Sequence, residues 1–274
     1  MTRVRHLVVG IVGAVAIVLT LVGLFAIETR PGPIERPLVP AGHEVLTEGT
    51  YATRAASGDI GPGGVCVPEP PATTCTQAET QVRLRLSGLP DPGAGRYHAF
   101  LLGASAMRPL GPLDADKDGF VLRSTAARDG QDADRLLVSL ESRTDTRRPG
   151  PLIVYEQDLD DDTDLSRRYT MHLIETVGEV RLNQIGAVEV SATAKATVPL
   201  PTPLDGWHLH AWFVDAAGRA VDLGPFEHGD DRAVLDARVE RVDLAVQTRF
   251  LVTLEPLDAA PEVPSDRLVS DVPL

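Results

Sequence analysis

The sequence has little positive charge and few aromatic residues. Its 274 residues contain 26 Lys and Arg against 39 Asp and Glu, which gives a net charge of −13, and lysine occurs only as Lys117 and Lys195. Nucleic-acid binding depends on the neutralisation of phosphates by Lys and Arg, so we expect no nucleic-acid partner. For the same reason, the charged surface is a poor match for an anionic lipid surface.

Motifs of common catalytic chemistry are also missing. There is no G-x-S-x-G, H-E-x-x-H, P-loop or G-x-G-x-x-G pattern, and GASAM at residues 103–107 lacks the closing glycine of a nucleophile elbow. We therefore expect no enzyme activity and no organic cofactor.

One long apolar run is present near the start of the chain. Residues 7–27 carry no charge and, as a helix, would span about 31 Å, close to the thickness of a bilayer core. The alternative is a cleaved signal peptide, but the apolar region of such a peptide normally has only about 7–15 residues. Arg3 and Arg5 precede the run, which places the N-terminus in the cytoplasm. We predict a single-pass cell-membrane protein with a cytoplasmic tip and anchor at residues 1–30 and the rest of the chain extracytoplasmic.

Cysteine occurs only twice, as Cys66 and Cys75. The spacing C-x₈-C is not typical of a metal site, whereas two nearby cysteines in an extracytoplasmic segment favour a disulfide. The sequence therefore predicts a Cys66–Cys75 disulfide.

The rest of the chain has the pattern of β-strands. Residues 31–42 contain four prolines, which favours an extended stalk. Beyond them, Val82, Leu84 and Leu86 alternate with polar residues, as in a strand with one buried face. With 24 glycines and 22 prolines and no sustained helical stripe, the sequence predicts an all-β protein built of antiparallel sandwiches.

Three landmarks occur twice in the same order. His98-Ala99 returns as His210-Ala211, Leu110-Gly111-Pro112 as Leu223-Gly224-Pro225, and LLVSLES at residues 136–142 as FLVTLEP at residues 250–256. The spacing of about 110 residues is that of a domain rather than of a solenoid repeat. With the acidic run at residues 156–168 as a linker, we predict two tandem immunoglobulin-like sandwiches, at residues 43–165 and 166–274.

The duplicated unit resembles the extracytoplasmic C-terminal domain of anti-sigma-K factors. The residues that carry the resemblance are LRLSGLPDPGAGRYHAFLL, LLVSLES and RRPGPLIVY in the first unit, and GWHLHAWFVDAAGRAVDLGPF, FLVTLEP and PSDRLVS in the second. They cover about residues 80–155 and 188–270. The resemblance implies an extracytoplasmic β-sandwich. Residues 1–6 are too short to be the family's cytoplasmic sigma-binding domain, so sigma-factor inhibition is not implied.

The segment DADKDGF is a candidate calcium loop. Asp114, Asp116, Asp118 and Gly119 have the spacing of a D-x-D-x-D-G loop, and Phe120 would offer its carbonyl oxygen. The bidentate acid is missing, because Thr125 stands at the twelfth position of the loop. The alternative is a hairpin turn, since Asp, Lys and Gly are turn formers.

A second candidate is the segment WHLHAWF. If it is a strand, His208, His210 and Trp212 lie on one face, where alternate histidines can bind zinc or copper. A third ligand would have to come from His98 or His228, and a partly covered sheet face is the alternative.

Taken together, these features predict a membrane-anchored extracytoplasmic protein that binds, senses or acts as a scaffold, with an envelope or membrane protein as its partner. The alternatives are an accessory subunit of a larger membrane complex and a metal-binding envelope protein.

Overall fold

The computed structural model describes residues 33–57, 65–69, 72–103, 107–127, 133–142, 147–160, 162–175, 177–185, 190–200 and 202–274. The apolar run at residues 7–27 lies outside them. No helix within the described ranges is long and apolar enough to cross a membrane. These ranges form antiparallel strands, joined in one place by the short 3₁₀ turn η1 (Leu244–Val246), so the predicted all-β class is confirmed.

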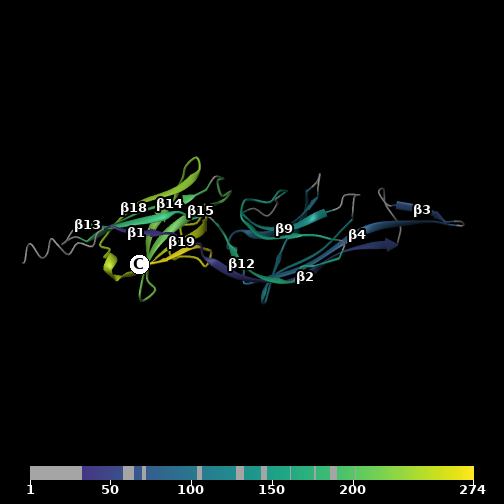
Figure 1. The fold of residues 1–274 in the computed structure, drawn as a ribbon, viewed down its shortest axis with the longest axis horizontal. Helices are drawn as coiled ribbons and strands as arrows, with labels where there is room; N and C mark the ends of the chain where they lie inside the picture. Colours follow the sequence, from purple (N-terminus) through teal and green to yellow (C-terminus); the bar gives the residue numbers. More distant parts are fainter. Residues whose placement is uncertain are drawn as a thin grey trace, which may run out of the picture.

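The strands form two pairs of sheets, which we name the first and second units (Figure 1). In the first unit, one sheet has the order β11-β2-β4-β8-β7, with β12 also paired to β2 and β3 to β4, and the other sheet has the order β10-β9-β5-β6. The bounds are β2 (Gly42–Ser57), β3 (Val65–Glu69), β4 (Ala72–Ser87), β5 (Arg96–Gly103), β6 (Met107–Pro112), β7 (Asp114–Asp116), β8 (Gly119–Ala127), β9 (Ala133–Glu141), β10 (Ile153–Asp158), β11 (Asp162–Asp164) and β12 (Arg167–His172).

The second unit has one sheet of order β1-β13-β14-β18-β17 and another of order β16-β15-β19-β20. The bounds are β1 (Ile34–Pro37), β13 (Glu179–Ile185), β14 (Ser191–Pro199), β15 (Trp207–Asp215), β16 (Ala220–Pro225), β17 (Glu227–His228), β18 (Arg232–Glu240), β19 (Gln247–Pro256) and β20 (Leu268–Pro273). The apolar residues on the inner faces of both units are buried, including Val82, Leu84 and Leu86, which confirms the alternation expected there.

The two units share their topology down to the irregularities. The path β2-β4-β8-β7 corresponds to β13-β14-β18-β17, and β10-β9-β5-β6 to β20-β19-β15-β16. The pairing of β5 with β6 shifts after Ala99, and that of β15 with β16 shifts after Ala211. Each shift lies opposite a glycine with positive φ, Gly111 at 111° and Gly224 at 96°. Bulges of this kind favour glycine, which explains why the Leu-Gly-Pro landmark occurs in both units.

The edge strands β1 and β12 are exchanged between the units. β1 immediately precedes β2 in the sequence but pairs with β13 of the second unit. β12 immediately precedes β13 but pairs with β2 of the first unit. In Figure 1 the purple β1 accordingly lies among the green and yellow strands, and the teal β12 lies beside β2.

The two connecting segments run past each other at the crossing point. The amide of Leu38 donates to the carbonyl of Gly178 at 2.8 Å, and His172 Nδ1 lies 3.1 Å from the carbonyl oxygen of Ala41. At a constant spacing of 135 residues, Leu38 aligns with Leu173 and Val45 with Val180, and all four side chains are buried. β1 and β12 are therefore equivalent strands, because each directly precedes the first strand of its own unit in the sequence. Each of them pairs at the edge of a sheet in the other unit.

This exchange places two segments differently from the sequence expectation. Residues 34–37, expected in a stalk at 31–42, form β1 within a sheet. The expected boundary at residue 165 lies between β11 and β12, which both pair with β2. The physical reason is that an edge strand hydrogen-bonds through its backbone, so the neighbouring sequence does not determine which sheet it joins.

A buried arginine of the second unit contacts the first unit. Arg267 Nη2 lies 3.0 Å from Glu255 Oε2, and the two side chains are 8% and 3% exposed. The same guanidinium donates through Nη1 to the carbonyl of Asp91 in the first unit at 2.7 Å, and it lies over the ring of Trp207, 5.6 Å from its centroid. The loop before β5 is held from its own side by Tyr97, whose hydroxyl donates to the carbonyl of Pro90 at 2.8 Å, and burial raises the pKa of that hydroxyl.

Candidate anion-binding site

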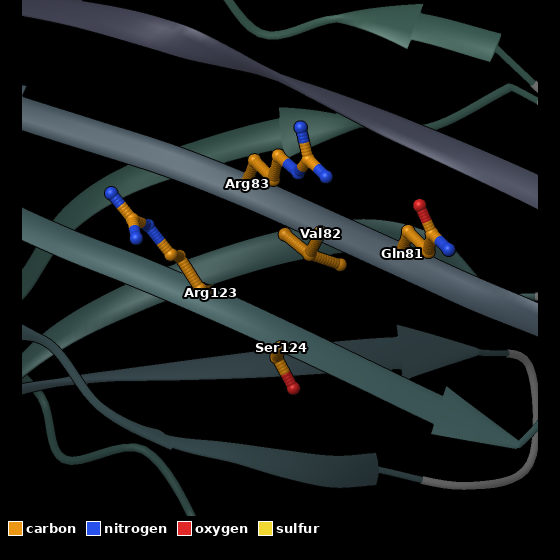
Figure 2. Close-up of a pocket in the computed structure, with 5 residues that line it drawn as sticks. All are labelled: Gln81, Val82, Arg83, Arg123 and Ser124. Carbon is orange, nitrogen blue, oxygen red and sulfur yellow. The ribbon is translucent and has the colours of Figure 1, made fainter.

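Two arginines face each other on neighbouring strands of the first unit. Arg83 on β4 and Arg123 on β8 are direct partners in the antiparallel register, and both are exposed. Figure 2 shows both guanidinium groups extending to one side of the strands and the hydroxyl of Ser124 extending to the other. Like charges that lie directly opposite each other destabilise a strand pair, so the pairing carries an electrostatic cost.

Neither guanidinium makes a hydrogen bond or an ion pair with the described residues, although the chain is strongly acidic. The two arginines line a hollow of about 470 Å³ together with Gln81, Val82 and Ser124. Gln81 lies two positions from Arg83 and therefore on the same face of β4. Thr50 lies directly opposite Arg83 on β2. The surface thus offers two guanidinium groups beside the side-chain amide of Gln81 and the hydroxyl of Thr50. All of these groups can donate hydrogen bonds.

Arg85, the next arginine along this face, is neutralised. It forms an ion pair with Asp116, to which it donates a hydrogen bond, and a second one with Asp118, whose Oδ2 lies 3.9 Å from Arg85 Nη1. Glu48 stands directly opposite it on β2. Within the described part of the sheet, Asp116 and Asp118 therefore pair with Arg85, whereas Asp114 and Asp116 line a neighbouring hollow with Arg123 without forming an ion pair with it.

The candidate calcium segment forms a tight hairpin between β7 and β8. Asp116 pairs with Gly119 across a turn of two residues, Lys117 and Asp118. Gly119 has a φ of 152°, and a Cβ there would lie 2.1 Å from the carbonyl oxygen of Leu86, so a side chain does not fit.

The four predicted calcium ligands do not converge within this hairpin. Asp116 and Asp118 flank Arg85, Asp114 is exposed on β7, and the ring of Phe120 packs edge-on against Tyr97 at 4.8 Å. Among the residues with described side chains, no three His, Cys, Asp or Glu are grouped for a metal. The geometry is that of the turn alternative, and calcium binding stays a prediction.

The histidine row on β15 is formed as the alternation predicts. His208 Nε2 lies 3.3 Å from His210 Nδ1, and the ring of His210 stacks on Trp212 at 4.7 Å. The third member is Asp222 on β16, whose carboxylate lies 2.7 Å from His210 Nε2. Burial and then the neighbouring His210 lower the pKa of His208, against the opposing effect of Glu255.

Sequence reasoning did not find Asp222, because it lies opposite β15 only through the register after the bulge. Of the two histidines considered, His98 lies on β5 of the first unit, at the place that His210 occupies in the second, and His228 lies on the short edge strand β17.

The two cysteines lie directly opposite each other. Cys66 on β3 and Cys75 on β4 are register partners in the hairpin that extends from the first unit. Their side chains lie outside the described part, so the disulfide stays a prediction.

The Arg83–Arg123 pair was not found from the sequence either. Alternation along β4 indicates that Arg83 is exposed, but only the register shows that Arg123 is its partner. A comparison with known proteins adds no assignment, because no family model, curated protein or solved structure matches this chain.

Proposed function

We propose that this protein is a non-enzymatic binding or scaffold protein of the bacterial envelope, anchored in the membrane by residues 7–27, with its N-terminus in the cytoplasm. The two units are then tandem immunoglobulin-like sandwiches related to the ectodomains of anti-sigma-K factors. Their strand orders support this proposal, because a four-stranded sheet facing a second sheet, with the chain crossing between them after the second strand, is the arrangement of immunoglobulin domains.

The exchange of β1 and β12 is the observation that carries the proposal. Each unit is completed by a strand that belongs, by sequence, to the other, and buried Arg267 of the second unit contacts the first unit again through the carbonyl of Asp91. Two independent domains joined by a flexible linker would need neither feature. The exchange supports a stiff two-unit body, which suits the presentation of a binding surface at a defined distance from the membrane.

The proposal predicts that partner recognition is a property of residues 28–274. Full-length protein would be purified by affinity from gently solubilised membranes, with a chain of residues 28–274 as the matched control, and the co-purifying proteins would be identified by mass spectrometry. We expect the same envelope partner with both chains. Partners retained only by the full-length chain would contradict the proposal and favour the accessory subunit of a membrane complex, which would act through its helix.

The metal-binding alternative is favoured by the row of His208, His210 and Asp222 alone. Calorimetric titration of the full-length chain with zinc and with calcium separates it from the binding-module proposal. Saturable zinc binding that is lost in His210→Ala would favour a site on β15, and calcium binding that is lost in Asp116→Asn would favour one in the β7–β8 hairpin.

A further inference from the structure

We propose that Arg83 and Arg123 form a binding site for a phosphate-type oxyanion. Each guanidinium presents a planar fork of N–H donors that can bind two oxygens at once, and phosphate is a preferred acceptor for this fork. Two forks on directly opposed strands suit a tetrahedral dianion, which offers more acceptor oxygens and more charge than one carboxylate.

The fold itself does not require two like charges at this place. The correspondence of the sheets places Arg83 at the position of Lys195 and Arg123 at that of Asp236 in the second unit, where the two residues are again direct partners and form an ion pair at 2.8 Å. The second unit therefore neutralises the same strand pair within the chain, whereas the first unit places two cations there. Two arginines that repel each other in the first unit are best accounted for by an anion that neutralises both.

The electrostatic environment also favours a local ligand. The protein carries a net charge of −13, but at physiological ionic strength charges more than about 8 Å apart are largely screened. Of the nearest described acids, Asp116 and Asp118 pair with Arg85, and Asp114 lies beside Arg123 without forming an ion pair with it. An anion that reaches the pair therefore meets two cations without an ion-pair partner among the described residues, and most of the acidic surface only weakly.

Calorimetric titration of the full-length chain at constant ionic strength tests the site, with inorganic phosphate in one arm and dimethyl phosphate in the other. We expect saturable binding with one site per chain. Tighter binding of inorganic phosphate would assign a terminal phosphate, and tighter binding of dimethyl phosphate would assign a phosphodiester. Absence of saturable binding in both arms overturns the proposal.

The decisive variant removes both guanidinium groups, Arg83→Thr with Arg123→Val. We expect binding weaker by at least about tenfold, because two charge-assisted contacts are lost. The matched control is Arg168→Thr with Arg238→Thr, which removes the same charge from exposed positions on β12 and β18 and should leave the affinity unchanged. Equal losses in both variants would show a general charge effect and overturn the assignment.

Two further measurements keep the test independent of folding. Circular dichroism should show the same β content in all variants, and without phosphate Arg83→Thr with Arg123→Val should raise the melting temperature because it removes the repulsion. If that variant fails to fold, Arg83→Lys with Arg123→Lys keeps the charge but loses the fork. The lysine variant should bind phosphate, but with an affinity several-fold lower than that of the unaltered chain. An unchanged affinity would overturn the proposal.

Discussion

The two units have the same strand order, but their second sheets are covered in different ways. In the second unit the segment before β2 runs along the edge of β20, where the amide of Ala41 donates to the carbonyl of Val269 at 2.9 Å. In the first unit the edge of β10 is covered by side chains instead. Tyr169 donates through its hydroxyl to the carbonyl of Val154 at 2.7 Å, and Arg167 donates to that of Glu156. The same sheet edge can thus be satisfied by backbone or by side chains, and duplicated units are free to diverge there.

A buried acid shows the same pattern of shared and divergent features. Glu141 accepts the amide of Gly150 at 2.6 Å, and Glu255 accepts that of Ser265 at 3.2 Å, at corresponding places in the two units. Among the described residues, Glu255 has a buried cationic partner, Arg267, and Glu141 has none. The shared acid thus orders a loop in both units, whereas the arginine lies where the second unit meets the first.

A cross-link that tests the strand exchange should give the largest effect, because the disulfide either forms or does not form. Glu35 and Arg181 are direct partners on β1 and β13, so Glu35→Cys with Arg181→Cys should form a disulfide on mild oxidation. The control is Glu35→Cys with Leu46→Cys, since Leu46 is the position in β2 that corresponds to Arg181 at the spacing of 135. We expect it to stay unlinked in non-reducing peptide mapping. The opposite result would show that β1 folds back on β2.

Removing the buried cation should have the next largest effect. Arg267→Leu introduces the residue found at the corresponding position of the first unit, Leu152. The two positions correspond because the carbonyl of Leu152 accepts the amide of Leu140, and the carbonyl of Arg267 accepts that of Leu254. It leaves the charge of Glu255 buried without its partner, so we expect the free energy of unfolding in urea to fall by about 3–5 kcal/mol. Arg267→Leu with Glu255→Gln should recover most of that loss. A loss below about 1 kcal/mol in the single variant would show that the pair adds little to the union of the units.

The smallest expected effect is a pH dependence specific to the second unit. Because the pKa of His208 is lowered in the folded protein, the unfolded chain binds protons more readily. His208 therefore has no effect on the free energy of unfolding at a pH well above the ordinary histidine pKa of 6.5, and it lowers that free energy as the pH falls below 6.5. His208→Gln should flatten this part of the stability profile in urea unfolding at pH 5 to 7.5, whereas His228→Gln, on the exposed β17, should leave it unchanged. Equal profiles for the unaltered chain and His208→Gln would contradict the assignment.

Features that depend on a single strand were predictable from the sequence. The alternation of Val82, Leu84 and Leu86 predicted the buried face of β4, and the same reasoning placed His208, His210 and Trp212 on one face of β15. Features that depend on pairing were not predictable. The partner of His210 on β16 and the partner of Arg83 on β8 both follow from register, which a single strand does not specify.

The sequence by itself determined that the described chain is all-β and that its landmarks recur, because side-chain alternation and glycine at bulges are local requirements of the backbone. Only the tertiary structure decided that β1 joins β13 and β12 joins β2, and that Arg83 faces Arg123. The reason is that an edge strand offers the same backbone donors and acceptors to either unit. Its choice depends on the register and on the packing of buried residues such as Leu38 and Leu173 at the crossing, which are contacts between segments far apart in the sequence.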